Sequence, residues 1–305
     1  MATENGLSLC GVCRQLGYSK QAYYQSLSRK TAAGRQLEQI KQKVVGVRHQ
    51  LPRLGTRKLY KLLGGDFKQA GLKIGRDRLF DLLRQESLLI VRKRKYVSTT
   101  DSRGWMRQYP NLVDGMALNR PEQLWVADIT YLRTKEGYNY LHLITDAYSK
   151  RIMGYKHSDN LGAGMSLEAL KMAFNQRYYR QSLIHHSDRG LQYCSRDYTE
   201  TLKQHKASIS MTQTGSPYDN AIAERINGIL KQEFGLDDVF ENMQDAGKQI
   251  NDAITSYNNL RPHLSNHYLT PEQMHRQQLL KPKTWHKKAT RKDTIPDGPL
   301  SSNQF

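Results

Sequence analysis

The segment from residue 124 to residue 211 constrains the fold most, because its apolar residues come in short runs typical of β-strands. Three runs follow one another without a helical segment between them, at 124–132, 138–146 and 151–155. Two further runs each follow a segment with helical periodicity, and they lie at 182–186 and 207–211. Helices are expected after the last run, at about 220–234 and 243–259. Successive strands followed by alternating helices and strands predict an α/β fold with a mixed five-stranded sheet.

The chain before residue 95 is expected to be all-helical. Two short helices fit residues 7–27, broken at Gly17-Tyr18-Ser19, where the glycine suits a left-handed helix end and Ser19 can cap the next helix. Apolar residues at helical spacing between Leu37 and Val47 indicate a further helix. The double glycine Gly64-Gly65 is expected to end a helix that starts near Thr56.

The last helix expected in this front segment carries basic residues. Gly75 precedes an amphipathic stretch, 76–84, with arginines on its open face. Short helices with tight turns and an arginine-bearing last helix fit a helix-turn-helix module. A plain helical bundle with a solvated charged face fits the pattern equally well, so the distribution of charge has to decide.

Positive charge is concentrated in the front of the chain. The formal charge of the 305 residues is +19, of which residues 1–120 contribute +16 and residues 121–305 contribute +3. A uniformly basic coat would spread evenly, whereas this asymmetry indicates a DNA-binding front joined to a nearly neutral body. It favours the helix-turn-helix interpretation and makes double-stranded DNA the expected partner. A membrane-surface role is the alternative, but no strongly amphipathic basic helix with bulky apolar residues supports it.

A polar stretch with little periodicity joins the front to the body. The basic run Arg92-Lys93-Arg94-Lys95 opens it, which is typical of a linker and can also clamp phosphates. Five parts are therefore expected: an N-terminal helical segment (1–30), a helix-turn-helix-like DNA-binding domain (31–95), a basic and polar linker (96–119), a catalytic core (120–280) and a basic tail (281–305).

The cysteines and the absence of long apolar stretches bear on the compartment. Three cysteines are too few for a disulfide framework, and neither a signal peptide nor an apolar stretch of the ~20 residues that span a bilayer is recognisable. A soluble protein of a reducing cytoplasm is therefore expected. Cys10 and Cys13 form a lone CxxC pair with no histidine before His49. Because a structural zinc site needs four ligands, both are expected to be ordinary helix residues.

Three acidic residues lie where a metal site is expected. Asp128 lies inside the first apolar run, where an unpaired carboxylate would be costly without a partner such as a metal ion. Asp188 follows the fourth run, and active-site groups often lie at strand ends in open α/β sheets. Glu224 falls in the first turns of the helix expected from about residue 220. Carboxylate oxygens suit Mg²⁺, and two such ions about 3.5–4 Å apart can activate an attacking oxygen and stabilise a leaving one.

The sequence around these acids makes the pattern specific. The three blocks are WVADITY at 125–131, HHSDRG at 185–190 and GSPYDNAIAE at 215–224. In this order they resemble the three catalytic blocks of the OrfB-type transposases, from the large bacterial insertion-sequence family whose elements carry two overlapping reading frames. The resemblance also includes Arg261-Pro262-His263, Thr270-Pro271-Glu272 and the front around Gly55-Thr56-Arg57, and so spans about residues 7–275.

This resemblance implies a ribonuclease-H-like core similar to that of retroviral integrases, with Asp128, Asp188 and Glu224 as the catalytic and metal-binding residues. It implies Mg²⁺ as the cofactor, with Mn²⁺ as a substitute. The implied substrates are the terminal inverted repeats of a mobile element and a target DNA, in the bacterial nucleoid. A homo-oligomer on DNA is expected, and because the working enzyme of this family is often a frameshift fusion, an upstream-frame partner is a further candidate.

The expected reaction is metal-dependent cleavage at an element end, followed by attack of the exposed 3′-hydroxyl on another phosphodiester. One alternative is a ribonuclease-H-like nuclease that only hydrolyses; it would share the acids but need no element-specific helical front. The other is a DNA-binding regulator with an inactive core, which would have lost a carboxylate. All three acids are present.

Neighbouring residues compete for roles in this site. His185 and His186 are expected to pack or hydrogen-bond beside it rather than act as bases, because carboxylates and metals can activate the nucleophile unaided. Asp146 ends the second run and is the competing candidate for a metal ligand, whereas Asp219 is expected to cap a helix. Two aromatic residues of the first run are expected in the core, Trp125 and Tyr131.

The expected DNA contacts combine the basic front with one helix face of the core. Asn227 and Lys231 lie three and seven residues after Glu224, on the same face of a helix, with a solvated face as the alternative. The full set of residues expected to contact DNA is Arg57, Lys58, Arg76, Arg78, Arg92, Lys93, Arg94, Lys95, Asn227 and Lys231.

Overall fold

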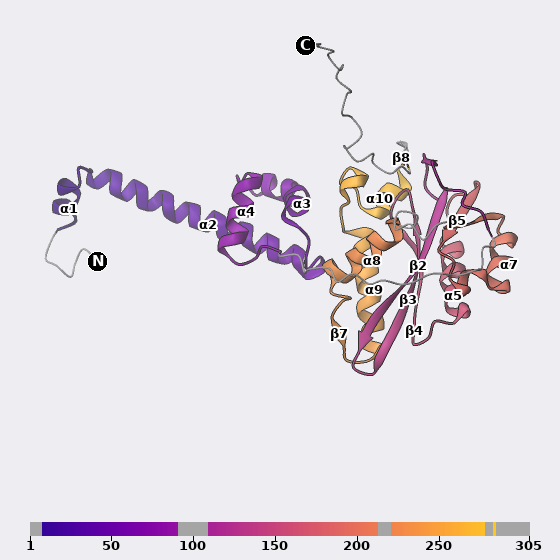
Figure 1. Ribbon diagram of the computed structural model, residues 1–305. Coiled ribbons are helices and arrows are strands. Elements are labelled where there is room, and N and C mark those ends of the chain that lie inside the picture. Colours follow the sequence, from indigo (N-terminus) through magenta and orange to yellow (C-terminus); the bar gives the residue numbers. More distant parts are fainter. Residues whose placement is uncertain (1–7, 91–108, 213–220, 278–282, 285–305) are drawn as a thin grey trace, which may run out of the picture. The chain divides into compact units, whose positions relative to one another are not determined.

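The computed structural model describes residues 8–90, 109–212, 221–277 and 283–284 (Figure 1). Within them the helices are α1 (Leu9–Gln15), α2 (Lys20–Gln50), α3 (Thr56–Gln69), α4 (Arg76–Gln85), α5 (Ala163–Asn175), α6 (Leu191–Cys194), α7 (Arg196–Gln204), α8 (Ala221–Phe234), α9 (Met243–Asn259), the 3-10 turn η1 (Leu264–Asn266) and α10 (Pro271–Arg276). The strands are β1 (Ala117–Leu118), β2 (Leu124–Thr134), β3 (Gly137–Asp146), β4 (Ile152–Ser158), β5 (Leu183–Ser187), β6 (Ala207–Met211), β7 (Val239–Phe240) and β8 (Lys283–Thr284). The strand-like runs and the helices expected at 220–234 and 243–259 are thus present.

The chain divides into two compact units. The helical unit combines Met1–Val97 with Gly228–Met274, and the sheet unit combines Ser98–Asn227 with His275–Phe305. The sequence predicts a core from residue 120 to residue 280, whereas residues 228–274 group with the front helices. Contacts inside the helical unit account for this difference: the backbone N–H of Arg53, for example, donates to the carbonyl oxygen of Glu233 over 3.2 Å.

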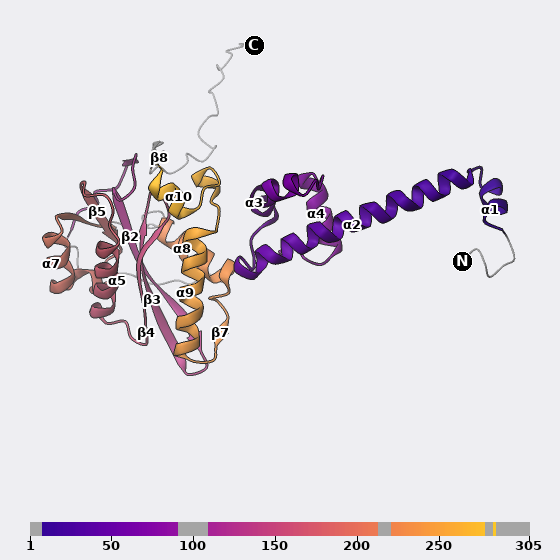
Figure 2. The ribbon, with the colours of Figure 1, turned by 180° about the vertical axis from the view of Figure 1, so that it is seen from behind.

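The sheet unit is built on strands in the order β4-β3-β2-β5-β6. Figures 1 and 2 show strands β2 to β5 of this sheet from opposite sides. β3 pairs antiparallel with both β2 and β4, whereas β5 pairs parallel with β2 and with β6. The first strand of this series therefore lies in the centre, and the later strands are added beside it after helical connections. This is the arrangement of ribonuclease-H-like folds, and it confirms the expected fold class.

One face of this sheet packs against α5 and α7. Trp125 and Ala127 of β2 belong to the same buried cluster as Phe174 of α5. Strand and helix approach each other closely at Gly154 of β4, where an added Cβ would lie 2.1 Å from the carbonyl oxygen of Ala169. Because that neighbour is backbone, only glycine lets α5 pack so tightly here.

Tyr131 is an exception to the expected core. Trp125 is fully buried as expected, but 48% of Tyr131 is exposed. Tyr131 lies towards the hairpin end of β2, beyond the residues of that strand in the buried cluster. Its ring packs instead against Tyr140 of β3, at a centroid distance of 5.2 Å.

In the helical unit, α2 is one helix of 31 residues where the sequence suggests two. Ser19 caps it as expected, and its Oγ accepts a hydrogen bond from the N–H of Ala22 over 3.0 Å. Residues 28–36 include arginine, lysine, alanine and glutamine, which favour helices, and no proline. The stretch contains one glycine, Gly34, which disfavours the helix by only about 1 kcal/mol and does not end it.

α3 likewise runs through Gly64-Gly65 instead of ending there. Leu59, Leu63 and Phe67 project at helical spacing into the buried cluster of the helical unit. This packing outweighs the roughly 1 kcal/mol by which each glycine disfavours a helix relative to alanine. α4 begins after Gly75 as expected. None of the described helices is long and apolar enough to cross a membrane.

Candidate active site

Asp128 and Asp188 lie at the same level of the sheet because β2 and β5 run parallel. The register pairs Val126 with His186. Asp128 follows Val126 by two residues, and Asp188 follows His186 by two residues. Since adjacent strands are about 4.8 Å apart, continuing this register brings the two carboxylates into one site.

The side chain of Asp128 is held by a residue from α8. Alternate residues of a strand point to opposite faces, so Asp128 points away from the cluster that contains Trp125 and Ala127. On that side the Asn227 amide Nδ2 donates to Asp128 Oδ2 over 2.7 Å. Asn227 is only 6% exposed, and its Oδ1 has no hydrogen-bond partner among the described residues. This burial points to the positioning of Asp128, and not to the direct DNA contact expected from the sequence.

Both aspartates hold their protons more tightly than isolated carboxyls. Burial, the charge of Asp188 and, to a lesser degree, that of Glu224 raise the pKa of Asp128 to about 7, while the hydrogen bond from Asn227 opposes this. Burial also raises the pKa of Asp188, although the N–H of Gly190 donates to its Oδ1 over 2.9 Å. A positive charge bound beside these two carboxyls would oppose both shifts and favour the ionised carboxylates.

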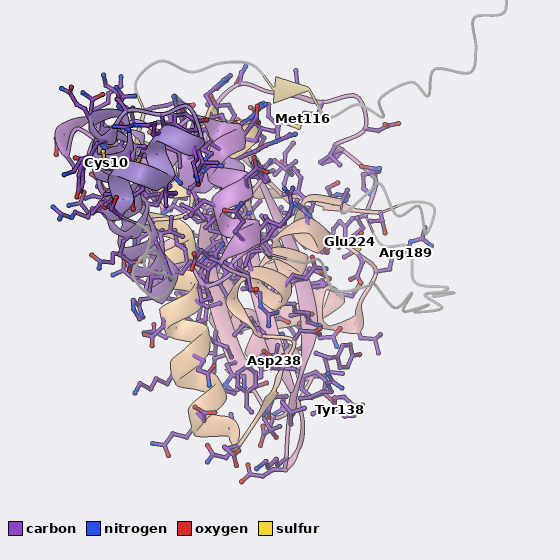
Figure 3. The ribbon with its side chains drawn as sticks, turned by 90° about the vertical axis from the view of Figure 1, so that its left-hand side faces the viewer. Cys10, Met116, Tyr138, Arg189, Glu224 and Asp238 are labelled. Atoms are coloured by element: carbon purple, nitrogen blue, oxygen red, sulfur yellow. The ribbon has the colours of Figure 1, made fainter. Side chains whose placement is uncertain are left out.

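Glu224 lies at the start of α8 and is exposed (Figure 3). It is close enough for its charge to raise the pKa of Asp128. Across the described parts of the chain, no three His, Cys, Asp or Glu side chains are gathered closely enough to enclose a metal ion. The sheet thus brings Asp128 and Asp188 together, and Glu224 stands near them without completing a site. The residues before α8, with the expected cap Asp219, lie outside the described residues.

His185 and His186 are buried and engaged inside the core. Nε2 of His185 lies 2.9 Å from the hydroxyl of Tyr198, and Nδ1 of His186 lies 2.8 Å from Oγ of Ser210. Burial, together with the nearby His186, lowers the pKa of His185 to about 3, so its ring is neutral at pH 7. These contacts support the packing role expected for both histidines.

Asp146, the competing candidate ligand, belongs to a separate buried cluster. It pairs with Trp125 across the β2–β3 ladder, three residues from the partner of Asp128. Its Oδ2 accepts hydrogen bonds from the N–H and the hydroxyl of Ser149, over 2.7 and 2.6 Å. Its Oδ1 accepts one from the N–H of Glu122 over 2.7 Å. Both carboxylate oxygens of Asp146 are therefore engaged in hydrogen bonds that stabilise the fold.

His275 joins this cluster from α10. Its Nε2 lies 3.1 Å from Oε1 of Glu122, and its Nδ1 lies 3.0 Å from Oγ of Ser149 and 3.7 Å from Oδ2 of Asp146. Neither Glu122 nor His275 was predicted from the sequence to be a functional residue. They are 153 residues apart, and only the fold brings them together.

The exposed arginines of the front helices remain available for DNA. Arg57 on α3 and Arg78 on α4 are exposed. Arg76 is also exposed, and its Nε lies 2.8 Å from Oδ1 of Asp77. The positions of these side chains are compatible with the expected contacts.

The other basic candidates are placed differently. Nζ of Lys58 lies 3.4 Å from Oε1 of Glu233, whose carboxylate also accepts hydrogen bonds of 2.8 and 2.6 Å from the buried Arg261. Lys58 thus helps to hold the helical unit together. Lys231 is half-buried on α8. The basic run 92–95 lies outside the described residues.

Two stretches of the chain match known protein families. Residues 119–217 match a family described as integrase core domain, and residues 205–271 match another family with the same description. The first match begins before β2 and contains Asp128 and Asp188. The second contains Glu224.

Known proteins resemble the chain over most of its length. A Shigella sonnei protein described as "Insertion element IS600 uncharacterized 31 kDa protein" is 35% identical over 256 residues, which cover 83% of this chain and 93% of that protein. The transposase for insertion sequence element IS904 of Lactococcus lactis is 30% identical over 238 residues, covering 77% of this chain and 92% of that protein. Among solved structures, the HTLV-2 integrase catalytic core domain in complex with magnesium (trimeric form) shares 20% identity at a TM-score of 0.42, over 51% of this chain and 97% of that chain.

Proposed function

This chain belongs to the OrfB-type transposases of bacterial insertion sequences, and we propose that it cuts and joins DNA at the ends of its element with Asp128, Asp188 and Glu224 as catalytic residues. One observation supports this assignment most. Asp128 and Asp188 follow paired positions of adjacent parallel strands, and Glu224 is close enough to raise the pKa of Asp128.

The donor set fits a divalent cation. All three candidates are carboxylates, whose oxygens Mg²⁺ prefers. Burial raises the pKa values of Asp128 and Asp188, and nearby negative charge adds to the shift at Asp128, so a bound cation would favour the ionised form of both. Asp128 and Asp188 would hold the ion from the sheet, and Glu224 would complete its protein ligands from α8. When bound, one or two Mg²⁺ or Mn²⁺ ions would activate the attacking oxygen and offset charge on the leaving one.

The proposed reaction has two displacements at phosphorus. In the first, water attacks at the element end, the bond from phosphorus to the 3′-oxygen breaks, and a 3′-hydroxyl and a 5′-phosphate result. In the second, this 3′-hydroxyl gives up its proton and attacks a target phosphodiester, and a target 3′-oxygen leaves and takes up a proton. Each step forms one P–O bond and breaks one, so neither a covalent enzyme intermediate nor an oxidant is required.

The alternatives differ from this proposal in their products. A nuclease of the same fold would release hydrolysed DNA and no joined strand, and an inactive DNA-binding regulator would yield neither. Incubating the chain with a pre-cleaved, labelled end duplex and a target plasmid separates all three. A labelled strand joined to the target is the result that the transposase proposal requires.

We also propose that the helical unit makes most of the contacts with DNA. Its exposed Arg57, Arg76 and Arg78 are the proposed contacts for the element ends and the target, and Lys231 on α8 is a further proposed phosphate contact. Because a transposition product needs both ends of one element, we propose that copies of the chain assemble on DNA. We further propose that a protein encoded by the upstream reading frame acts as a partner of this chain.

The first expected outcome concerns Asn227. Asn227→Ala should lower strand-transfer activity by about 10- to 100-fold, the range seen when hydrogen-bond partners of metal ligands are removed. The variant should also need more Mg²⁺ for half-maximal activity, because Asp128 loses the 2.7 Å bond that orients it and favours its ionised form. The measurement is a divalent-cation titration of strand transfer.

Asn175→Ala, at the exposed end of α5, is the matched control and should behave like the unaltered chain. DNA affinity should stay the same in both variants. Weakened DNA binding by Asn227→Ala, with an unchanged metal requirement, would assign Asn227 to DNA contact instead.

A further inference from the structure

We propose that one face of α3 binds the sugar–phosphate backbone of a DNA strand, in a hollow formed by lysines and a double glycine. This inference rests on the proposed function, because it names where the helical unit holds its DNA. The residues that carry it were not among the DNA contacts expected from the sequence, and they are Lys61, Gly64, Gly65, Lys68 and Lys73.

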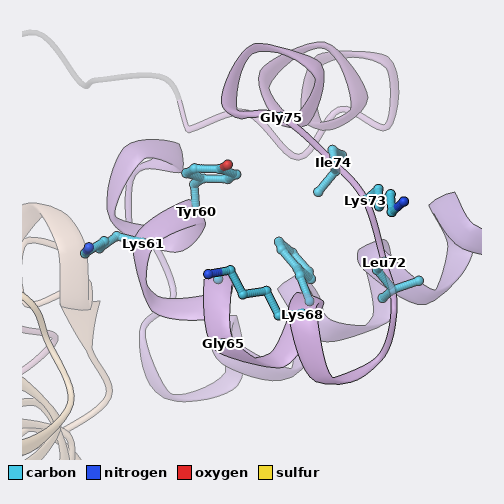
Figure 4. A pocket seen from close by; sticks show the side chains of 10 residues that line it. Tyr60, Lys61, Gly65, Lys68, Leu72, Lys73, Ile74 and Gly75 are labelled. Atoms are coloured by element: carbon cyan, nitrogen blue, oxygen red, sulfur yellow. The ribbon is translucent and has the colours of Figure 1, made fainter.

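The hollow has a volume of about 740 Å³ and lies between α3 and the segment that leads into α4 (Figure 4). Tyr60 and Lys68 line it from α3, and Lys73 and Ile74 line it from the other segment. That segment is held in place by a turn, in which Gly71 has a φ of 67° and the N–H of Leu72 donates to the carbonyl oxygen of Phe67 over 2.8 Å. The hollow is therefore a built feature of the helix–turn–helix.

The two glycines are unexplained by packing within the described structure. Both Gly64 and Gly65 lie in the interior of α3 and line the hollow, and a Cβ at either would meet nothing within 4 Å. Glycine in a helix interior destabilises the helix relative to alanine. The missing side chains leave room for a ligand to approach the helix backbone, which is a recognised use of glycine.

The lysines give this space a positive charge. Lys61 and Lys68 lie on the same face of α3, on either side of the glycines and about 10 Å apart along the axis at 1.5 Å per residue. Lys73 lines the hollow from the opposite segment. Among the described residues, no acidic side chain pairs with any of the three, and Nζ of Lys61 lies 5.9 Å from the ring centroid of Tyr268. Three cations without counter-charges fit a chain of phosphates.

A sugar–phosphate strand matches both halves of this surface. Its phosphates suit the lysines, and the carbon faces of its sugars suit the half-buried apolar lining by Tyr60 and Ile74. In helix-turn-helix complexes the first helix crosses the DNA backbone while the second enters the groove. In the pair formed by α3 and α4, α3 corresponds to this first helix. An acidic protein segment is the other class of occupant, and the experiment distinguishes it.

Filling the hollow tests the proposal in the full chain. Gly65→Leu introduces a good helix former, so its thermal unfolding midpoint should not fall, while the new side chain occupies the hollow. Affinity for a fluorescein-labelled blunt DNA duplex should fall at least about tenfold, a loss that corresponds to one good contact. Gly34→Leu on α2, where a Cβ also meets nothing within 4 Å, is the matched control and should leave affinity unchanged.

Removing the charges gives an independent readout. A variant with Lys61, Lys68 and Lys73 all changed to Gln should flatten the slope of log affinity against log salt by about 2 to 3, close to 0.9 for each lost phosphate contact. A control removes three positive charges from the exposed part of α2, with Arg29, Lys30 and Arg35 changed to Gln. It should change the slope much less.

Unchanged DNA affinity in the hollow variants would overturn the inference and leave a protein segment as the occupant. An equal change in slope from the α2 control would overturn it too, because the charge would then act diffusely. Neither result touches strand transfer by the unaltered chain. Failure of the proposed function would look different: an unaltered chain that binds the duplex normally and joins no ends.

Discussion

Replacing any one of the three acids by its amide is expected to abolish cleavage and strand transfer while DNA binding is retained. Asp128→Asn, Asp188→Asn and Glu224→Gln each keep the size of the side chain and remove one anionic ligand. Activity on a labelled end duplex with Mg²⁺ should fall by at least two to three orders of magnitude, on the order of the loss when one group that stabilises charge in the transition state is removed. Near-normal strand transfer by one variant would remove that residue from the assignment.

Thermal unfolding supplies the control for these variants. Because burial and the charge of Asp188 raise the pKa of Asp128 to about 7, the ionised Asp128 is unfavourable in the folded state. Asp128→Asn should therefore unfold at a temperature equal to or above that of the unaltered chain at pH 8. A variant that is both inactive and less stable would point to a structural role for the carboxylate.

The second large effect is expected at His275. Its imidazolium lies between the fully buried carboxylates of Glu122 and Asp146, and its own side chain is 3% exposed. His275→Gln would keep a side chain that can form hydrogen bonds and remove the positive charge. Breaking a buried ion pair by removing one partner typically costs about 3–5 kcal/mol, and we expect a loss of unfolding free energy in this range by chemical denaturation. His49→Gln, at an exposed position of α2, is the control.

The same cluster predicts how stability depends on pH. Burial alone would lower the pKa of His275, but the hydrogen bonds and charges of Asp146 and Glu122 raise it from 6.5 to about 8. A histidine whose pKa is raised by folding stabilises the fold fully at pH values below its pKa in the unfolded chain. This stabilisation is lost as the pH rises through its pKa in the folded chain. The contribution, about 2 kcal/mol at 1.36 kcal/mol per pKa unit, should thus be present below pH 6.5 and be lost between about pH 6.5 and 8.

The pH dependence can be isolated by comparing two chains. Burial raises the pKa of Asp146, but His275 and Ser149 outweigh it and lower that pKa below its usual value. The contribution of Asp146 to the pH dependence of stability is therefore confined to acidic pH, well below the range in which His275 titrates. The stability difference between the unaltered chain and His275→Gln should shrink from pH 6 to pH 9. A difference that stays constant over this range would contradict the account of the cluster.

Most of the fold could be predicted because each short strand is marked by an apolar pattern within its own segment. The β2–β3–β4 series and the helices α8 and α9 follow apolar periodicity that each segment carries by itself. The prediction was wrong where distant packing outweighs a local signal. At Gly64-Gly65 the helix continues because Leu63 and Phe67 are buried in the cluster of the helical unit. No sequence pattern states that residues 228–274 group with the front helices.

The site was predictable to the extent that strands place its residues. Asp128 and Asp188 could be placed side by side from two runs of sequence, once the parallel pairing of those runs was assumed. Asn227 was recognised as lying on the face of Glu224, but its bond to Asp128 depends on how α8 packs on the sheet. The contact between Glu122 and His275 spans 153 residues and depends wholly on the tertiary fold.

Strand transfer from pre-cleaved ends tests the central claim most directly. A labelled duplex that ends in the 3′-hydroxyl of the element should become covalently joined to a target plasmid by the unaltered chain with Mg²⁺ or Mn²⁺. Asp128→Asn, tested in parallel, should bind the same duplex and join none of it. Cutting of the target with no joined label would contradict the transposase assignment and identify a nuclease. Equal joining by Asp128→Asn would contradict the assignment of the site.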